Sequence, residues 1–253
     1  MKNVATIAML GFACLTLPHP ALAQKKSKPK PAITKPAEPA LPAVCPLATG
    51  ETLVTLVTSK GPIEVAIDAQ RAPITGGNFL RYVDSRKMDG ALFYRVMKLG
   101  AEGSGEGVIQ GGQRNPEKIM PAIAHEPTTQ TGLSHVEGSL SMARGAPGSA
   151  TSDFFVMMKD IKAFDANPSQ PGDNLGYAVF GHVTKGMDIV RAIYADPIDP
   201  AKGPLVGQML AAPVDIKRAR RTPLLKADDP TCVAATQPVP EAPAATPDST
   251  SST

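Results

Sequence analysis

A single arginine lies in the apolar part of the stretch Leu92–Asn115, which reads LFYRVMKLGAEGSGEGVIQGGQRN. Arg95 stands between Tyr94 and Val96, in a segment whose neighbours read as a buried strand. A guanidinium is always protonated, is planar and stiff, and carries five N–H donors. Such a group can donate to a lone pair that becomes localised during a reaction. Arg95 is therefore a candidate catalytic side chain.

Other catalytic patterns are missing from the sequence. After the first 23 residues, three isolated histidines remain, His125, His135 and His182, with no metal-ligand spacing, and they read as surface or loop residues. There is no G-x-S-x-G elbow and no phosphate loop that ends in Gly-Lys-Ser/Thr. The glycines of 103–107 suggest a dinucleotide fingerprint, but this run joins two predicted strands and opens no helix. The sequence therefore favours a site without metal, cofactor or covalent nucleophile.

One reaction needs none of these groups, namely rotation about the peptide bond that precedes proline. Amide resonance imposes a barrier of about 18–20 kcal/mol on this rotation, so that it takes tens to hundreds of seconds without a catalyst. In the twisted state the prolyl nitrogen becomes pyramidal and its lone pair can accept a hydrogen bond. A catalyst needs an apolar pocket for the proline ring and a donor such as Arg95 aimed at that nitrogen.

The elements that must position Arg95 are mostly strands. TLVTLVTS (52–59) and PIEVAID (62–68) are β-branched segments around a Lys60-Gly61 turn and predict a hairpin. Helices are predicted at 72–87, with Pro73 in the first turn, and at 186–194. Further strands are predicted at 92–97, 107–112, 138–143, 153–158, 177–183 and 213–220. Many strands with few helices predict a mainly β protein, a closed barrel whose ends are covered by helices.

Composition separates one folded domain from its flanks. Residues 24–50 are rich in Lys, Pro and Ala, and residues 226–253 are rich in Pro, Ala and Thr, so both segments are expected to be disordered. The domain is expected at 51–225. Residues 48–229 carry 20 basic and 20 acidic residues, so this region offers no net field for phosphate and no nucleic-acid partner is expected. The lysines of 24–50 favour a solvated spacer, with contact to a membrane surface or the cell wall as the alternative.

The first 23 residues have the pattern of an export signal. Lys2 supplies the positive start, an apolar stretch follows, and Ala21-Leu22-Ala23 matches a cleavage site. A lipoprotein reading at Cys14 is disfavoured because Gly11 occupies the position where a leucine-like residue is expected. The apolar run is too short for a membrane span, and no later segment reaches the necessary length. An exported, periplasmic protein is expected.

Two cysteines, Cys45 and Cys232, remain after removal of this signal. In an oxidising compartment such a pair favours a disulfide, and the pair is not in a C-x-x-C arrangement. Because the two residues flank the predicted domain, a bridge would join its ends. The alternative is a pair of free or intermolecular thiols on disordered segments.

Five ordered motifs resemble the cyclophilin family of peptidyl-prolyl isomerases, especially its exported bacterial members. They are FYRV (93–96), IQGG (109–112), GSLSMAR (138–144), SATSDFFV (149–156) and GYAVFGHVTKGMDIV (176–190). The resemblance covers nearly all of residues 51–220. It implies a closed eight-stranded antiparallel barrel capped by two helices, which agrees with the pattern of strands above.

The resemblance also implies roles for individual residues. Arg95 matches the family's catalytic arginine, and Gln110 matches the glutamine that orients the substrate backbone beside it. From the residues alone, Arg95 could be a surface arginine and Gln110 a polar residue before a Gly-Gly bend. Phe155 matches the floor of the proline pocket, for which core packing is the alternative. The other residues implied in substrate binding are Val108, Met142, Ala143, Phe164 and Tyr177.

Several positions depart from the family pattern. Gly107 and Val108 stand where the family has Phe-Met, after an apparent insertion, so the pocket lacks an aromatic wall. We expect either weak activity or another apolar side chain over this gap, with Leu99 as the nearest candidate. Asp153 replaces the usual glutamine, and Arg144 lies where many members have asparagine.

Two functions follow from these expectations. The first is a monomeric, cofactor-free isomerase that binds proline-containing segments of exported proteins and speeds their folding. The alternative is a weakly active or inactive proline-peptide binding module, or a chaperone of the cell envelope. Retention of Arg95, Gln110 and Phe155 favours the isomerase, whereas the glycine at position 107 favours the binding module.

Overall fold

A computed structural model describes residues 38–47, 49–226 and 228–235 of the 253-residue chain. The chain divides into two compact units, Met1–Pro39 and Ala40–Thr253, and the description below concerns the second. The predicted export signal, Cys14 and most of the predicted linker lie outside the described residues. None of the described helices is both long and apolar enough to cross a membrane.

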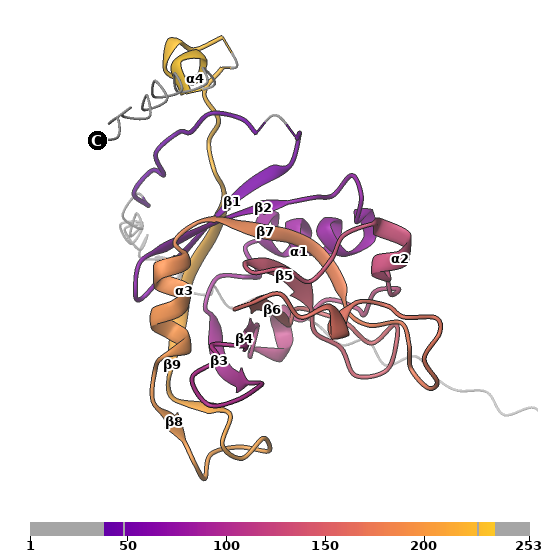
Figure 1. The fold of residues 1–253 in the computed structure, drawn as a ribbon. Helices are drawn as coiled ribbons and strands as arrows, with labels where there is room; N and C mark the ends of the chain where they lie inside the picture. Colours follow the sequence, from indigo (N-terminus) through magenta and orange to yellow (C-terminus); the bar gives the residue numbers. More distant parts are fainter. Residues whose placement is uncertain (1–37, 48, 227, 236–253) are drawn as a thin grey trace, which may run out of the picture. The chain divides into compact units, whose positions relative to one another are not determined.

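The second unit is built on a closed antiparallel barrel (Figure 1). The strands follow the order β1-β2-β7-β5-β6-β4-β3-β9, and pairing between β1 and β9 closes the barrel, while the two-residue β8 pairs with β9. The strands are β1 (Thr52–Thr58), β2 (Pro62–Ile67), β3 (Ala91–Lys98), β4 (Gly107–Gly112), β5 (Ser139–Met142), β6 (Phe154–Met157), β7 (Ala178–Lys185), β8 (Ile198–Asp199) and β9 (Met209–Arg221). The closed eight-stranded barrel that the sequence predicted is confirmed.

Two helices pack against the barrel as predicted. Helix α1 (Pro73–Asp84) contacts β7 and β9, and helix α3 (Met187–Tyr194) contacts β2 and β4. The short helix α2 (Thr128–Thr131), the 3₁₀ turns Pro116–Lys118 and Lys162–Phe164, and β8 were not predicted from the sequence. Strand β9 begins four residues before its predicted start, because the first part of this strand has no regular alternation of buried residues.

A buried glutamate completes the N-terminus of α1. Pro73 occupies the first turn, as expected from its fixed φ angle and missing N–H. The Glu126 carboxylate accepts hydrogen bonds from the backbone N–H groups of Ile74 (3.0 Å) and Thr75 (2.6 Å). Gly76 allows the helix to approach the preceding chain, since a Cβ there would lie 3.1 Å from Ala69 Cα. The helix is therefore anchored by a residue 51 positions away that no local pattern reveals.

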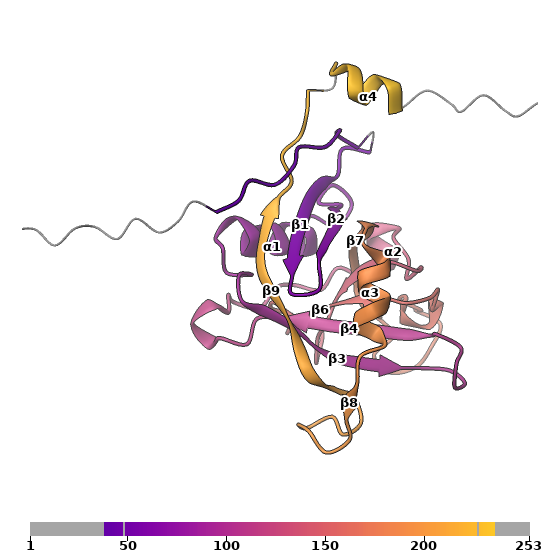
Figure 2. The same cartoon turned by 90° about the vertical axis from the view of Figure 1, so that its left-hand side faces the viewer.

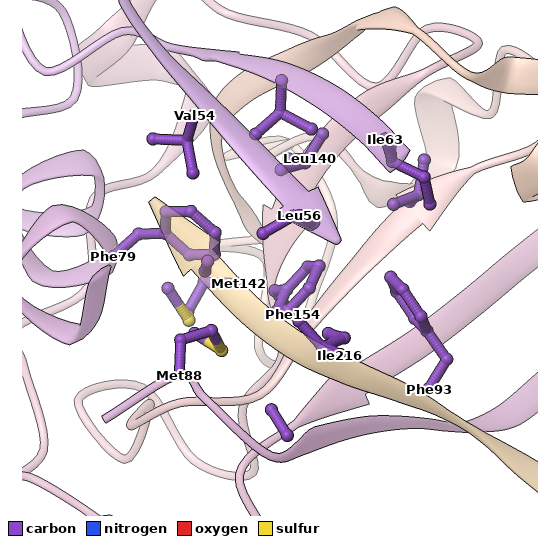
Figure 3. Packing of buried hydrophobic residues seen from close by; sticks show 14 of the residues in the cluster. Val54, Leu56, Ile63, Phe79, Met88, Phe93, Leu140, Met142, Phe154 and Ile216 are labelled. Atoms are coloured by element: carbon purple, nitrogen blue, oxygen red, sulfur yellow. The ribbon is translucent and has the colours of Figure 1, made fainter. Parts of the chain in front are cut away.

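Aromatic rings fill the barrel interior (Figure 3). Phe154 of β6 is edge-on to Phe79 of α1, with ring centroids 5.4 Å apart, and to Phe93 of β3, at 5.7 Å. Leu56, Leu140 and the other strands' inward residues close around these rings. Burial of this continuous apolar cluster provides the main driving force for closing the barrel.

The ends of the domain are joined covalently, as predicted. Cys45 and Cys232 form a disulfide with Cα atoms 5.3 Å apart, across 187 residues of sequence. Val44 pairs with Leu224 beyond the end of β9, with hydrogen bonds from Val44 N–H to the Pro223 carbonyl (2.9 Å) and from Leu225 N–H to the Val44 carbonyl (2.8 Å).

Parts of both flanking segments are therefore ordered, although their composition predicts disorder. Helix α4 (Pro230–Ala235), which carries Cys232, lies within the predicted tail, and Figure 2 shows it beyond the end of β9. The backbone pairing and the disulfide supply the order that composition alone does not predict.

Candidate functional site: an arginine beside an outer apolar cluster

A β-bulge decides where Arg95 points. The ladders of β3 with β4 and of β3 with β9 both shift register between Phe93 and Arg95. Phe93 and Val96 are completely buried in the barrel interior, so strict alternation would have left Arg95 facing inward. The extra residue, Tyr94, restores the alternation, and both Tyr94 and Arg95 face outward. The charge in this apolar segment therefore lies outside the core.

Two glutamines hold the guanidinium of Arg95. Nη1 donates to Gln110 Oε1 (2.7 Å), and Nε donates to Gln208 Oε1 (2.8 Å). Nη2 donates to the same Gln208 oxygen and to Met97 Sδ at 3.4 Å. These contacts use four of the five N–H donors, and within the described part of the chain the second N–H of Nη1 has no acceptor. The guanidinium is thus fixed in orientation while one donor stays available.

Gln208 is a site residue that the sequence analysis missed. It precedes β9 and is fixed by its own backbone, because its carbonyl accepts from the N–H of Val96 at 2.8 Å. It lies 113 residues from Arg95 in a loop without regular structure. No motif marks it, so only the pairing of β3 with the start of β9 could have revealed it.

Arg95, Gln110 and Phe155 form one cross-strand row on the outside of the barrel. Arg95 of β3 pairs with Gln110 of β4, and Gln110 pairs with Phe155 of β6. Strands are about 4.8 Å apart, so the backbones of Arg95 and Phe155 are separated by about 10 Å. The structure therefore places the predicted donor, the predicted backbone-orienting residue and the predicted pocket floor side by side.

An apolar cluster adjoins this row and is separate from the barrel interior. It is built on Val108, Phe155 and Met157, which are almost completely buried. Phe155 is edge-on to Tyr177 (centroids 5.3 Å apart) and to Phe164 (5.9 Å). The partly buried residues that pack against it are Met97, Ala143, Ile161, Phe164 and Tyr177. We call these eight residues the outer cluster.

The outer cluster brings together five of the residues that the resemblance implied in substrate binding: Val108, Ala143, Phe155, Phe164 and Tyr177. Met142 lies elsewhere. Its side chain is 2% exposed and packs in the barrel interior, as Figure 3 shows. Because neighbouring residues on a strand face opposite sides, Met142 and Ala143 cannot both present side chains to the groove. Only the backbone of Met142 remains available for the role implied by the resemblance.

Leu99 does not cover the gap at Gly107, because the side chain beside Gly107 is that of Tyr194 on α3, whose Oη would lie 2.8 Å from an added Cβ. Met97 packs against the outer cluster next to Val108, with which it pairs across β3 and β4. Leu99 does not pack there, since it lies in the 99–106 loop with its N–H bonded to the Glu106 carbonyl at 2.9 Å. The flexible thioether of Met97 is suited to fill an irregular gap.

Restoring an aromatic residue at position 107 is expected to destabilise the protein. Gly107 has φ of 148°, and a Cβ there would lie 2.2 Å from the Met97 carbonyl oxygen. We expect Gly107→Phe to cost at least about 1–3 kcal/mol of unfolding free energy, without raising kcat/KM. Gly103→Ala is the control, since Gly103 also has positive φ but has nothing within 4 Å of a Cβ. A Gly107→Phe protein with wild-type stability in urea unfolding and higher activity would contradict this.

Arg144 fixes the loop that leads into Tyr177 of the outer cluster. Its guanidinium binds the Asp173 carboxylate (Nη1 to Oδ2, 2.6 Å) and the Gly176 carbonyl (Nη2 to O, 2.6 Å). It also lies 5.4 Å from the centre of the Tyr177 ring. The departure from asparagine at this position therefore has a structural role, because the residue ties the 173–176 segment to the strand that ends at Met142.

A buried histidine lies behind Phe155: His135 is in a loop, as expected, but it is not on the surface. The ring is fully buried and stacked on Phe155, with centroids 6.1 Å apart. Nδ1 donates to Asp165 Oδ1 (2.6 Å), and Nε2 accepts from Ser141 Oγ (2.9 Å). Burial lowers the pKa of His135, an effect that Asp165 only partly offsets, so the ring is neutral at neutral pH.

This arrangement of Ser141, His135 and Asp165 has the residue types of a hydrolase triad, but its geometry excludes that function. Ser141 and His135 are both completely buried, so no substrate can reach the hydroxyl. The three side chains instead support the floor of the outer cluster. Across the described ranges there is also no group of three or more His, Cys, Asp or Glu residues that could hold a metal ion.

Truncation of the cluster's central ring should affect both stability and activity. Phe155 is 4% exposed and contacts the rings of His135, Phe164 and Tyr177. We expect Phe155→Ala to lower the unfolding free energy by about 3–5 kcal/mol and to raise KM for a proline peptide. Leu175→Ala, at a residue 38% exposed, is the control and should change neither. An unchanged urea midpoint together with unchanged KM would show that Phe155 is misassigned.

Comparisons with known proteins agree with this geometry. Residues 53–220 match the family described as Cyclophilin type peptidyl-prolyl cis-trans isomerase/CLD. The chain is 36% identical over 151 residues to peptidyl-prolyl cis-trans isomerase A of Dickeya dadantii, which covers 58% of this chain and 73% of that protein. It is 36% identical over 149 residues to a peptidyl-prolyl cis-trans isomerase of Acinetobacter baylyi, with the same coverage of 58% and 73%.

A solved structure also shares the fold. It is a cyclophilin type peptidyl-prolyl cis-trans isomerase of Cryptosporidium parvum, determined in the presence of the dipeptide Ala-Pro. Its TM-score is 0.50 at 18% identity, and the match covers 67% of this chain and 98% of that one. Because the family match spans the whole barrel, from β1 to β9, the chain belongs to the cyclophilin-type peptidyl-prolyl cis-trans isomerase family.

Proposed function

We propose that this family member catalyses cis-trans isomerisation of peptide bonds that precede proline, with Arg95 as the hydrogen-bond donor to the twisted prolyl nitrogen. The observation that carries the proposal is the cross-strand row in which a fixed guanidinium adjoins the outer cluster. Gln110 orients the substrate backbone, and Phe155 forms the floor that receives the proline ring. The family's named activity and the Ala-Pro dipeptide of the Cryptosporidium parvum protein support this assignment.

The proposed mechanism is selective stabilisation of the twisted amide. In both planar isomers the nitrogen lone pair is delocalised and accepts hydrogen bonds poorly. In the twisted state it is localised and can accept from the Nη1 N–H that Gln110 and Gln208 leave available. Because the donor is already held in place, little free energy is needed to reorient it when the amide twists. The hydrogen bond therefore stabilises the twisted state more than the bound planar isomers and lowers the barrier to rotation.

We further propose that the protein is exported and acts in the periplasm as a monomer, on proline-containing segments of exported proteins. The signal-like pattern of residues 1–23 supports export, although it lies outside the described residues. The Cys45–Cys232 disulfide supports an oxidising compartment.

The second candidate, a binding module with little catalysis, is favoured by Gly107, because this position lacks the aromatic side chain expected from the family and has Tyr194 of α3 beside it instead. A protease-coupled assay on a short Ala-Pro peptide, with the protein from residue 24 onward, separates the two. We expect acceleration that saturates with peptide concentration. NMR exchange spectroscopy on the same peptide should show enzyme-dependent exchange between the cis and trans signals. Peptide binding with no such exchange would establish the binding module and overturn the isomerase.

A further inference from the structure

A chain of hydrogen bonds runs from Gln110 away from Arg95 and ends on an ion pair. Gln110 Nε2 donates to the Tyr94 hydroxyl (2.7 Å), and that hydroxyl donates to Asp153 Oδ2 (2.9 Å). The other carboxylate oxygen of Asp153 accepts from Arg114 Nη2. The Arg114 guanidinium also stacks over the Tyr94 ring, 4.3 Å from its centroid. These four residues are contributed by β3, β4 and the segments next to β4 and β6.

The backbone at Gly112 leaves the space that the Asp153 carboxylate occupies. Gly112, the second glycine of the IQGG motif, faces Asp153, and a Cβ there would lie 2.0 Å from Asp153 Oδ1. The Asp153 carbonyl accepts from the N–H of Ala143 at 2.8 Å, which ties the residue to the strand that borders the outer cluster. A larger residue at position 112 would displace the carboxylate, so the glycine and the aspartate fit each other.

Each hydrogen bond in this chain has a fixed direction. A glutamine amide presents an oxygen on one side and an NH₂ group on the other, and the two orientations occupy nearly the same space. The guanidinium of Arg95 is donor-only, so Gln110 can bind it only with Oε1. Its NH₂ group then points at the Tyr94 hydroxyl, which must accept and must pass its own proton to another acceptor. The carboxylate of Asp153 is acceptor-only and receives it.

The protonation states fit this direction. Burial raises the pKa of the Tyr94 hydroxyl, and the neighbouring Asp153 charge raises it further, so Tyr94 stays protonated and can donate. Burial lowers the pKa of Arg114, but the hydrogen bond and the charge of Asp153 more than offset this, so its net shift is upward. Arg114 therefore remains a cation, paired with the Asp153 carboxylate.

We propose that Tyr94 and Asp153 are positioning residues for catalysis, which set the amide orientation of Gln110 and through it the orientation of the Arg95 guanidinium. This inference rests on the proposed function, in which Arg95 donates to the prolyl nitrogen. Asp153 stands where the family resemblance leads one to expect glutamine. An amide at this position could donate to Tyr94 as well as accept from it, so it could not impose a direction. With Asp153 in this position, the Tyr94 hydroxyl can only donate to the carboxylate and must accept from Gln110.

The proposal can be tested by substitutions that keep the shape of the side chain but remove the fixed direction of its hydrogen bonds. In Asp153→Asn an NH₂ group can face the Tyr94 hydroxyl and donate to it. The hydroxyl proton then turns toward Gln110 and favours the amide orientation in which the oxygen of Gln110 faces Tyr94. In that orientation the NH₂ group of Gln110 faces the donor-only guanidinium of Arg95, and the two cannot form a hydrogen bond. In Tyr94→Phe the acceptor for the Gln110 NH₂ group is lost. We expect each variant to lower kcat by roughly tenfold, with KM changed less than about twofold, since each loses about one net hydrogen bond at the donor but none in the outer cluster.

Non-additivity is the readout that a merely structural role would not give. Because both residues act through Gln110, the double variant should lose no more kcat than the worse single variant. Asp153→Glu, which keeps an acceptor-only group, should regain part of the loss. The Nη1–H NMR signal of Arg95, which reports its bond to Gln110, should exchange faster with water in Asp153→Asn than in the wild type. Asp215→Asn, at an exposed carboxylate on β9, is the matched control and should change none of these quantities.

Arg95→Ala separates failure of this inference from failure of the proposed function. If the wild-type protein binds the peptide without cis-trans exchange, the proposed function is wrong, and if Arg95→Ala retains wild-type kcat, the role proposed for Arg95 is wrong. If Arg95→Ala abolishes activity while Tyr94→Phe and Asp153→Asn both keep wild-type kcat, only the inference is overturned. Losses that multiply in the double variant would also overturn it, because they would show two independent effects. Should Asp153→Asn fail to fold, the kcat of the near-isosteric Tyr94→Phe decides the question.

Discussion

Arg95→Ala is expected to lower kcat for a proline peptide by about 10²- to 10³-fold, the loss typical for removal of one preorganised transition-state donor. The side chain is half-buried and faces the outside of the barrel, so its removal leaves no cavity in the interior cluster. The thermal midpoint should therefore stay close to that of the wild type. KM should change less than kcat, because the outer cluster, which is the proposed site of the proline ring, is intact.

Arg95→Lys separates the guanidinium's geometry from its charge. An ammonium is a point charge on a flexible stem and cannot bind Gln110 and Gln208 on two sides while presenting a third donor. We expect most of the activity to be lost in this variant too. Arg221→Ala, which removes an exposed guanidinium paired with Asp84, serves as the control with unchanged kcat. Wild-type kcat in Arg95→Ala, measured by the protease-coupled assay, would rule out the mechanism.

Removal of the disulfide should give the largest loss of stability. Cys45 and Cys232 close a loop across 187 residues, and the chain-entropy model assigns such a crosslink up to about 5 kcal/mol through restriction of the unfolded chain. We expect a Cys45→Ser, Cys232→Ser double variant to unfold at a clearly lower urea concentration than the oxidised wild type. The pairing of Val44 with Leu224 does not involve the sulfur atoms, so we expect it to persist in the folded variant and the loss to arise mainly from the unfolded state.

Reductant provides the control for this experiment. Dithiothreitol should lower the midpoint of the wild type toward that of the double variant and leave the double variant unchanged. Thiol counting on the unfolded, unreduced protein should find no free thiol at either position. Equal midpoints with and without reductant, or two reactive thiols per chain, would contradict the proposed role of the bridge.

Much of the architecture could be predicted from the sequence because it depends on local patterns. Alternation of β-branched residues around Lys60-Gly61 marks the β1–β2 hairpin, and Pro73 marks the start of α1. The order of five motifs predicted the barrel and placed Arg95, Gln110 and Phe155 on β3, β4 and β6. The disulfide was predicted because two cysteines remain after the signal and lie on either side of the domain. Each of these signals is carried by neighbours in the sequence or by a count of residue types.

The direction of individual side chains was decided by the tertiary structure. Strict alternation would have turned Arg95 inward, and the bulge at Tyr94 turns it out. Met142 and Ala143 are neighbours in one motif, yet one side chain fills the interior and the other borders the outer cluster. His135 reads as an isolated polar residue but is buried between Phe155 and Asp165. A side chain's face depends on register with partner strands, which a single sequence does not contain.

The contacts that complete the site are the most distant in sequence. Gln208 reaches Arg95 across 113 residues, and the Tyr94 hydroxyl reaches Asp153 across 59. Met97, and not Leu99, packs beside Val108, because β3 continues in register with β4 through position 98 before the chain turns away. The sequence by itself indicated the eight strands of the barrel and made Arg95 the predicted donor to a prolyl nitrogen. Closure of the barrel decided which side chains hold that donor, because only strand pairing brings residues so far apart in the chain within hydrogen-bonding distance.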